Sequence, residues 1–255
     1  MKKLNTKIID LHNQEGVKIL SVFKGDYFTA ILDQHKVYEQ HFTDFLYDVL
    51  LPGDVALDLG ANLGYHTINM ANIVGRDGQV HAFEAQRIIF QQLTCNVFLN
   101  QLTNVYTYNN AIGNSFESVF IEDPNYFHDG TYPNVTNIGN SAINLSNRGN
   151  EVKQLTINSL NLSKLNFIKL DIQGSELMAL QGGVTTIEKF QPYIFIEIEN
   201  EQLQRFNIGK QEIIDFFKVL KYSTYRITNT DDYICLPEHS KYDINRYKNA
   251  VEEIE

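Results

Sequence analysis

A turn with two glycines is the first part of this sequence whose residue types suggest chemistry. The stretch DLGANLGYHT, residues 58–67, follows an apolar run and places Gly60 and Gly64 on either side of the turn. Glycine there lets the backbone approach a ligand because no Cβ stands in the way. The middle position is Asn62, and the third glycine of the dinucleotide fingerprint is missing. Asp58 would also repel a diphosphate, so the turn favours a ligand that carries positive charge.

A second acidic residue suggests that this ligand contains a nucleoside. Glu84 closes the next strand-like run, and a carboxylate at that place can accept hydrogen bonds from two ribose hydroxyls. The ribose can belong to NAD or to S-adenosylmethionine, and the ammonium and sulfonium of the latter suit Asp58 better. The alternative for both features is a plain strand-end turn with a solvated carboxylate.

Alternating strands and helices are needed to bring these positions together. Apolar runs at 55–60 and 80–84 predict strands, and helical spacing follows at 64–74 and 87–100. The alternation continues with short connections, which predicts a mostly parallel sheet covered on both faces. YSTYRI and YICL are separated by only a short turn, so they must form an antiparallel pair. The further expected elements are strands at 105–111, 116–122, 151–157, 166–172 and 193–199 and helices at 174–189 and 209–221.

Both ends of the chain lie outside this alternation. Residues 17–32 predict a hairpin around Lys24-Gly25-Asp26, and 36–50 predict a helix that ends before Pro52-Gly53. We therefore divide the chain into an N-terminal hairpin and helix cap (1–50), a main domain (51–237) and a charged C-terminal tail (238–255). The tail is expected to be a short helix or to lack regular structure.

The composition narrows the class of protein. A hydrophobic content of 43% and a charged content of 20% are typical of a soluble globular chain. The formal charge of -10 argues against a nucleic-acid partner, and no apolar run approaches the ~20 residues of a membrane helix. The start, MKKLNTKIIDLHNQ, lacks the apolar stretch of a signal peptide. Cys95 and Cys235 form no disulfide framework, so we expect a cytoplasmic protein without nucleic-acid or membrane partners.

Five motifs in order resemble the FkbM-type family of S-adenosylmethionine-dependent methyltransferases, and they cover most of the chain. The resemblance implies a Rossmann-like class I α/β fold, with a mostly parallel seven-stranded sheet and a terminal antiparallel strand. The cofactor that it implies is S-adenosylmethionine. The motifs are LLPGDVALDLGANLGYHT (50–67), GRDGQVHAFEA (75–85), LTNVYTYNNAIGN (102–114), LTINSL with FIKLDIQGSELMALQGG (155–183) and PYIFIEIE (192–199).

The resemblance also implies an activity and a set of site residues. Family members are O-methyltransferases that act on hydroxyls of sugars or of other secondary metabolites. Asn110 and Ala111, after the third strand, are expected to border the adenine. The implied cofactor-binding residues are Asp58, Gly60, Asn62, Gly64, Tyr65, Glu84, Ala85, Asn110, Ala111 and Asp171.

Three positions depart from the family pattern. Gln173 stands where "D-x-E-G-x-E" has its first glutamate, and Asn158 replaces the aspartate of "T-[LI]-D-x-L". Both changes put in doubt any role that needs those carboxylates. Ala85 replaces the proline that usually follows the ribose-binding acid, which is a turn adjustment.

Acidic residues at strand ends are the candidates for the reacting centre. Methyl transfer is an in-line displacement, so alignment can supply roughly 7–11 kcal/mol and a base about 10²–10⁴-fold in rate. Asp171 ends the fourth strand and is expected to be the base or to orient the acceptor, with helix capping as the alternative. Glu197, in the fifth strand, is expected to contact substrate or to make a structural hydrogen bond. His66 can act as a base near neutral pH, with a core or cofactor-side histidine as the alternative.

The polar loop of residues 123–150 is expected to cover the acceptor. Tyr126, His128 and Tyr132 can stack on sugar rings, and a flexible insertion is the alternative. Glu176 and Glu197 are further candidates for acceptor contacts. Convergence of these two with Asp171 would suit magnesium, which leaves no strict spacing signature, and no metal is predicted.

Other functions remain open at this point. An NAD-dependent oxidoreductase shares the sheet and the ribose acid, but Asp58 and the missing glycine argue against it. A non-catalytic glycan-binding module on the same fold is kept open by Gln173 and Asn158. A nucleic-acid methyltransferase is disfavoured by the charge. The sequence names neither the acceptor nor the oligomeric state.

Overall fold

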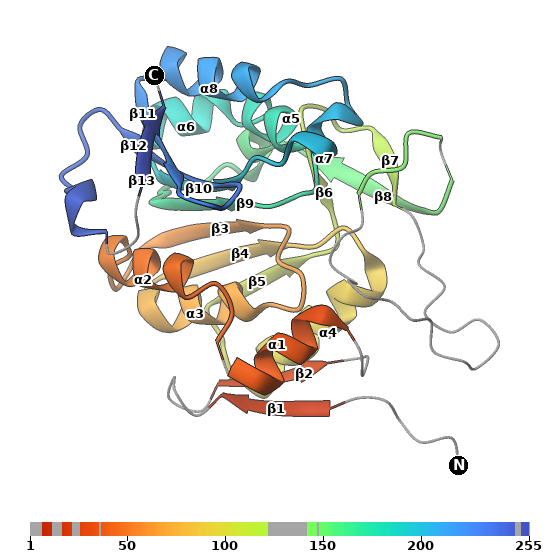
Figure 1. The fold of residues 1–255 in the computed structure, drawn as a ribbon. Helices are drawn as coiled ribbons and strands as arrows, with labels where there is room; N and C mark the ends of the chain where they lie inside the picture. The colour runs from red at the N-terminus through yellow and green to blue at the C-terminus, as the bar shows by residue number, and fades with distance from the viewer. Residues whose placement is uncertain are drawn as a thin grey trace.

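A computed structural model describes residues 7–11, 17–21, 26–35, 37–121, 142–146, 148–247 and 251–254, the side chains of 17–21 excepted. A central sheet with helices on both faces organises them (Figure 1). None of the helices in these ranges is long and apolar enough to cross a membrane.

The central sheet has the strand order β13-β11-β12-β10-β9-β3-β4-β5. Five neighbouring strands, β10, β9, β3, β4 and β5, run parallel to one another, whereas β12 pairs antiparallel with both β10 and β11. The expected Rossmann-like fold is confirmed, including the antiparallel hairpin. The bounds are β3 Val55–Leu59, β4 Gln79–Phe83, β5 Val105–Tyr108, β9 Phe167–Leu170, β10 Tyr193–Glu197, β11 Tyr222–Ile227 and β12 Asp232–Pro237.

Two hydrophobic layers hold helices against this sheet. Alternate strand residues face opposite sides, so Ala56 and Phe167 pack with Phe42 and Met70, while Leu57 belongs to the layer on the other face. Burial of each large apolar side chain contributes about 1.5–3 kcal/mol. The helices are α2 Gln40–Val49, α3 Tyr65–Val74 and α4 Arg87–Leu99, then α5 Glu176–Gln181, α6 Val184–Phe190, α7 Asn200–Gln204 and α8 Lys210–Val219.

Two expected elements are interrupted. The helix expected at 174–189 is divided into α5 and α6, and Gly182 at the break passes so close to another segment that a Cβ there would lie 2.0 Å from the Gly113 carbonyl oxygen. The strand expected at 105–111 ends at Tyr108 and resumes as β6. A three-stranded sheet, β6 Ala111–Ile112, β8 Asn150–Leu155 and β7 Ser118–Ile121, follows, and a 3-10 helix covers Ile157–Leu160.

The N-terminal expectation was partly wrong. The hairpin is formed by β1 Lys7–Leu11 and β2 Val17–Ser21, and the second expected strand is instead the helix α1, Tyr27–His35. The carboxylate of Asp26 accepts hydrogen bonds from the backbone N–H and hydroxyl of Thr29, at 3.0 and 3.2 Å. Asp26 therefore caps the start of a helix. Aspartate is common both at helix starts and in turns, so the residue type alone did not distinguish the two structures. Lys24 and Gly25 lie outside the described residues.

The C-terminal segment joins the sheet, which the sequence pattern did not indicate. After a 3-10 helix at Ile244–Arg246, strand β13 Val251–Ile254 pairs antiparallel with β11. The sheet thus has eight strands where seven were expected. Tyr247 is buried beside α2 and its hydroxyl donates to the carbonyl of His41 at 3.0 Å.

Candidate functional site

The glycine turn adopts backbone conformations that explain its spacing. Gly60, Asn62 and Gly64 have φ values of 81°, 50° and 91°. Asparagine tolerates this left-handed region better than most residues, which accounts for its place between the glycines. A Cβ on Gly60 would lie 1.8 Å from the backbone oxygen of Asp171, so the turn and the end of β9 meet in direct backbone contact.

Glu84 ties the turn to the end of β4. Its carboxylate accepts the backbone N–H of Asn62 at 2.9 Å and that of Gln86 at 2.8 Å. Burial raises the pKa of Glu84 to about 7, against the effect of these hydrogen bonds. Each carboxylate oxygen keeps acceptor capacity for a further donor such as a ribose hydroxyl.

A pocket with an empty volume of about 660 Å³ opens beside this turn. Its wall is mixed, with polar groups such as Glu84 and Asn110 beside apolar side chains such as Ile112. The lining residues are Gly60, Asn62, Phe83, Glu84, Ala85, Gln86, Ile89, Asn110, Ala111, Ile112, Ile121, Ile143, Asp171, Ile172, Gln173 and Ser175.

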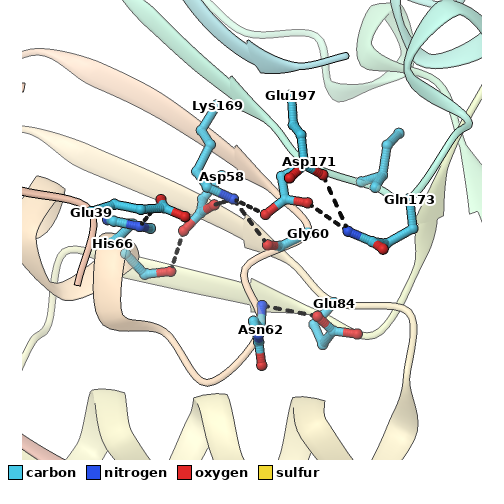
Figure 2. Close-up of polar contacts among 12 residues, drawn as sticks. Glu39, Asp58, Gly60, Asn62, His66, Glu84, Lys169, Asp171, Gln173 and Glu197 are labelled. Carbon is cyan, nitrogen blue, oxygen red and sulfur yellow. Dashed lines mark hydrogen bonds and ion pairs between the residues drawn. The ribbon is translucent and has the colours of Figure 1, made fainter. Parts of the chain in front are cut away.

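Lys169 is a buried cation beneath the turn that the sequence analysis missed. Its ammonium lies 3.2 Å from Asp171 Oδ2, 3.3 Å from the Gly60 carbonyl oxygen and 3.8 Å from Asp58 Oδ1 (Figure 2). The strand register pairs Asp58 directly with Lys169, and Thr67 donates to Asp58 Oδ2 at 2.5 Å. A lysine inside the apolar run FIKLDI is costly to bury without partners. Its position in that run could therefore have indicated a buried ion pair at this strand.

The charge of Lys169 is set by its neighbours. Burial alone would lower the pKa of this ammonium, but the carboxylates of Asp171, Asp58 and Glu39 outweigh burial and raise its pKa. Lys169 is therefore a permanent positive charge below the carboxyl ends of the strands.

Asp171, Gln173 and Glu197 form the adjoining polar cluster. The Gln173 amide nitrogen donates to Asp171 Oδ1 at 2.9 Å and lies 3.4 Å from Glu197 Oε2 (Figure 2). Its amide oxygen accepts from Gln202 at 2.9 Å. Burial, followed by the charges of Asp171 and Asp232, raises the pKa of Glu197 far above its ordinary value, so this carboxyl holds a proton at neutral pH.

The two departures from the family pattern acquire physical roles here. Gln173 supplies an N–H donor to the carboxylate of Asp171, where a glutamate would add a further negative charge next to it. Asn158 accepts from the backbone N–H and the hydroxyl of Thr186, both at 2.9 Å, at the start of α6. An asparagine oxygen caps a helix as well as an aspartate oxygen does.

Several predicted site residues do not line the pocket. The Tyr65 hydroxyl accepts the Tyr38 backbone N–H at 3.3 Å, and its ring lies in the layer with Phe28. The described residues that line the pocket do not include Tyr65, Gly64, Asp58 or Glu197. Their assigned contacts to cofactor or acceptor stay predictions.

His66 and Glu176 are held by protein groups. His66 Nε2 lies 2.9 Å from Glu39 Oε2, and its ring makes an edge contact with Phe42, with centroids 4.5 Å apart. This environment favours the core alternative for His66. Glu176 is buried and accepts the backbone N–H groups of Ile172 and Gly174, at 3.0 and 3.2 Å, so its carboxylate shapes the loop after β9.

Tyr126, His128 and Tyr132 lie outside the described residues, so their role in covering an acceptor stays a prediction. Within the described ranges, no group of three His, Cys, Asp or Glu side chains is arranged to hold a metal ion. This statement includes the acidic trio of Asp171, Glu176 and Glu197.

Tertiary structure adds residues from distant segments to the same edge. Glu39 directly precedes α2. His41 lies in the first turn of α2, and its Nε2 is 2.9 Å from Asp232 Oδ2. Asp232 starts β12 and stands opposite Glu197 in the antiparallel register. No local sequence signal connects residues so far apart, because their proximity depends on the strand order.

Known families and structures resemble this chain as follows. The profile described as "Methyltransferase FkbM domain" matches residues 58–227. A methyltransferase FkbM structure from Methylobacillus flagellatus has a TM-score of 0.50 and 16% identity, over 76% of this chain and 50% of that one, so the chain spans about half of its length. No curated protein matches.

Two other solved structures are similar at lower scores. A candidate rRNA methylase from Clostridium thermocellum has a TM-score of 0.49 and 12% identity, over 85% of this chain and 95% of that one. A candidate methyltransferase from Streptococcus mutans in complex with SAH has a TM-score of 0.46 and 13% identity, over 84% and 97%. At such identities a structural likeness says nothing about an acceptor.

Proposed function

The chain belongs to the FkbM family of S-adenosylmethionine-dependent methyltransferases, and we propose that it methylates a hydroxyl oxygen of a sugar or glycan. The acceptor is a small molecule or glycan, and neither a nucleic acid nor a membrane is a partner in this proposal. The acidic composition supports the first exclusion. A cytoplasmic location is part of the proposal, favoured by the free cysteines Cys95 and Cys235.

The pocket suits the nucleoside end of this cofactor. Glu84 presents acceptor oxygens beside the turn, and Ala111 and Ile112 offer an apolar wall to an adenine. Gly60 keeps the backbone surface free of a Cβ, which would collide with Asp171. When bound, the cofactor supplies an electrophilic methyl group on a sulfonium.

The carboxylate of Asp171 is the single observation that carries the hydroxyl proposal. It lines the pocket, its side chain is 35% exposed, and the Gln173 amide and the Lys169 ammonium fix its two oxygens. A carboxylate so oriented can accept the proton of an acceptor hydroxyl while the oxygen attacks. Such a base contributes about 10²–10⁴-fold in rate.

Glu197 and His66 take different places in this proposal. Glu197 holds its own proton next to Asp171, so it acts as a donor that orients the base or the acceptor rather than as the base. His66 is engaged by Glu39 and lies outside the pocket wall of described residues, so the proposal assigns it no proton transfer.

The sugar acceptor is supported by the family resemblance and by the aromatic and amide residues of the 123–150 segment. A non-sugar secondary metabolite is the alternative acceptor. A non-catalytic glycan-binding module is the alternative function. The departures Gln173 and Asn158 kept it open, and it is disfavoured because both side chains form hydrogen bonds within the fold.

The test has two stages. Calorimetric titration with S-adenosylhomocysteine should show binding, and its absence at high micromolar ligand would refute the cofactor assignment. A methyl-donor consumption screen should then find turnover with monosaccharides or oligosaccharides. Cofactor binding without turnover on any hydroxyl acceptor would favour the non-catalytic module.

A further inference from the structure

Glu39 lies in a strained backbone conformation directly before α2, outside the segment that matches the family. Its φ and ψ are 45° and 61°, in the left-handed region that is unfavourable for a residue with a long side chain. It occupies the N-cap position of α2, yet among the described residues its carboxylate makes no capping bond. Strain of this kind persists where surrounding structure enforces it, often at functional sites.

The carboxylate of Glu39 turns instead toward the carboxyl edge of the sheet. His66 Nε2, on α3, lies 2.9 Å from Glu39 Oε2, and the Glu39 side chain is 25% exposed. Burial would raise the pKa of Glu39, but the His66 hydrogen bond and the nearby charges of His66 and Lys169 lower it to about 2. Glu39 is therefore ionised under all ordinary conditions.

Negative charge exceeds positive charge around Lys169. The carboxylates of Glu39, Asp58 and Asp171 lie around this one ammonium. Three negative charges with one positive charge give a formal net charge of -2 when His66 is neutral, and a protonated His66 makes it -1. Asp58 is fully buried, and its Oδ1 has no hydrogen-bond partner among the described residues. Such an imbalance is costly in a buried place unless a cation joins the cluster.

This cluster continues from the pocket on the side away from the ribose acid. Gly60 and Asp171 line the pocket and also contact Lys169. Figure 2 shows Glu39 and Glu84 on opposite sides of the Gly60 turn. A ligand whose ribose meets Glu84 would therefore extend its other end past Gly60 toward the cluster.

We propose that Glu39 binds the ammonium group at the amino-acid end of the cofactor and that His66 positions Glu39 for it. The inference rests on the proposed function, since it needs the same cofactor. The ammonium and sulfonium together exceed the single carboxylate of that ligand by one positive charge, which reduces the imbalance around Lys169. The N-terminal segment thereby becomes part of the cofactor site.

Paired ligands separate this role from a merely structural one. Calorimetric titrations of the wild type and of Glu39→Gln should use S-adenosylhomocysteine and 5′-methylthioadenosine, which lacks the amino-acid end. We expect Glu39→Gln to weaken adenosylhomocysteine binding about tenfold or more and to leave methylthioadenosine binding unchanged. His66→Asn should weaken only the same ligand, by a smaller factor. Asp44→Asn removes a charge from the same helix, where Asp44 accepts a hydrogen bond from Gln40, and should change neither affinity.

Three results would overturn the proposal. Unchanged adenosylhomocysteine affinity in Glu39→Gln would remove Glu39 from the site. An equal loss for both ligands would show that the substitution deforms the whole pocket. Absence of adenosylhomocysteine binding by the wild type would overturn the cofactor assignment and this inference together, which distinguishes it from the first two results.

Discussion

The two halves of the site are built in different ways. At the β3–β4 side, the turn of Gly60–Gly64 and the single acid Glu84 act mainly through backbone conformation and backbone N–H groups. At the β9–β10–β12 side, charged side chains such as Lys169, Asp171 and Glu197 act on one another. The first half shapes a pocket, and the second half sets charges and proton positions. Substitutions should therefore damage folding and binding at the first side, and reaction chemistry at the second.

The largest effect is expected at Gly60. In Gly60→Ala the new Cβ would lie 1.8 Å from the Asp171 backbone oxygen, so the backbone after β3 or after β9 must shift. We expect a loss of at least about 3 kcal/mol in unfolding free energy and no measurable adenosylhomocysteine binding. Gly53→Ala is the matched control, because Gly53 also has positive φ but open space around its Cβ position among the described residues. Similar denaturation midpoints for the two variants would contradict the close-contact argument.

The next effect tests the reaction side. Asp171→Asn should keep adenosylhomocysteine affinity within a few-fold and lower kcat by about 10²–10⁴, because the amide cannot take a proton. The comparison variant is Asp231→Asn, whose carboxylate pairs with Lys210 and Arg226 at the surface. If Asp171→Asn turns over at nearly the wild-type rate, Asp171 is not the base.

Gln173→Glu sharpens the contrast between shape and charge. It keeps the side-chain length but replaces a donor to Asp171 and Glu197 with another negative charge. Proton affinity in the cluster should rise, so the acidic limb of the pH–kcat profile should move to higher pH by roughly one unit. Adenosylhomocysteine affinity should change little. An unshifted profile would mean that Gln173 does not interact electrostatically with the base.

The pocket side has its own pH dependence. Burial raises the pKa of Glu84 to about 7, so this carboxyl gains a proton as the pH falls through 7 and loses acceptor capacity for ribose. Affinity for adenosylhomocysteine should be constant above about pH 8 and fall by at most about tenfold per unit below 7. Glu84→Gln should bind weakly and without this dependence between pH 6 and 8. A flat wild-type profile would contradict the raised pKa.

The smallest effect is expected at Asn158, which lies apart from both halves. Asn158→Ala should cost about 1 kcal/mol of stability through the lost cap of α6. Asn158→Asp should be nearly neutral, and neither variant should alter cofactor affinity. Thermal unfolding and calorimetry measure the two quantities. A binding defect in Asn158→Ala would instead connect this position to the site.

The part of the site that the sequence predicted depends on neighbouring residues. Glycine permits the positive φ observed at Gly60 and Gly64, and Glu84 closes a strand whose hydrophobic pattern is plain. Asp171 was found for the same reason, because it ends an apolar run. Lys169, two residues earlier, was overlooked although its burial in that run required partners.

Errors arose where one residue type serves two structures. Asp26 starts α1 through its carboxylate, yet next to Lys24-Gly25 it resembled a hairpin turn. The helix expected at 174–189 is interrupted between α5 and α6, where Gly182 packs against the backbone of Gly113, a contact between segments far apart in the chain. Strand β13 is short and charged, and it pairs with β11, which would otherwise be the edge of the sheet.

By itself the sequence determined the α/β alternation, the antiparallel end of the sheet, the glycine turn and its acidic companion. Each of these follows from hydrophobic period or from backbone preferences of adjacent residues. Only the tertiary structure decided that Glu39 and Asp232 join Asp171 at one edge. The physical reason is that strand order and antiparallel register bring residues together across long stretches of chain, and no local preference encodes which strand ends become neighbours.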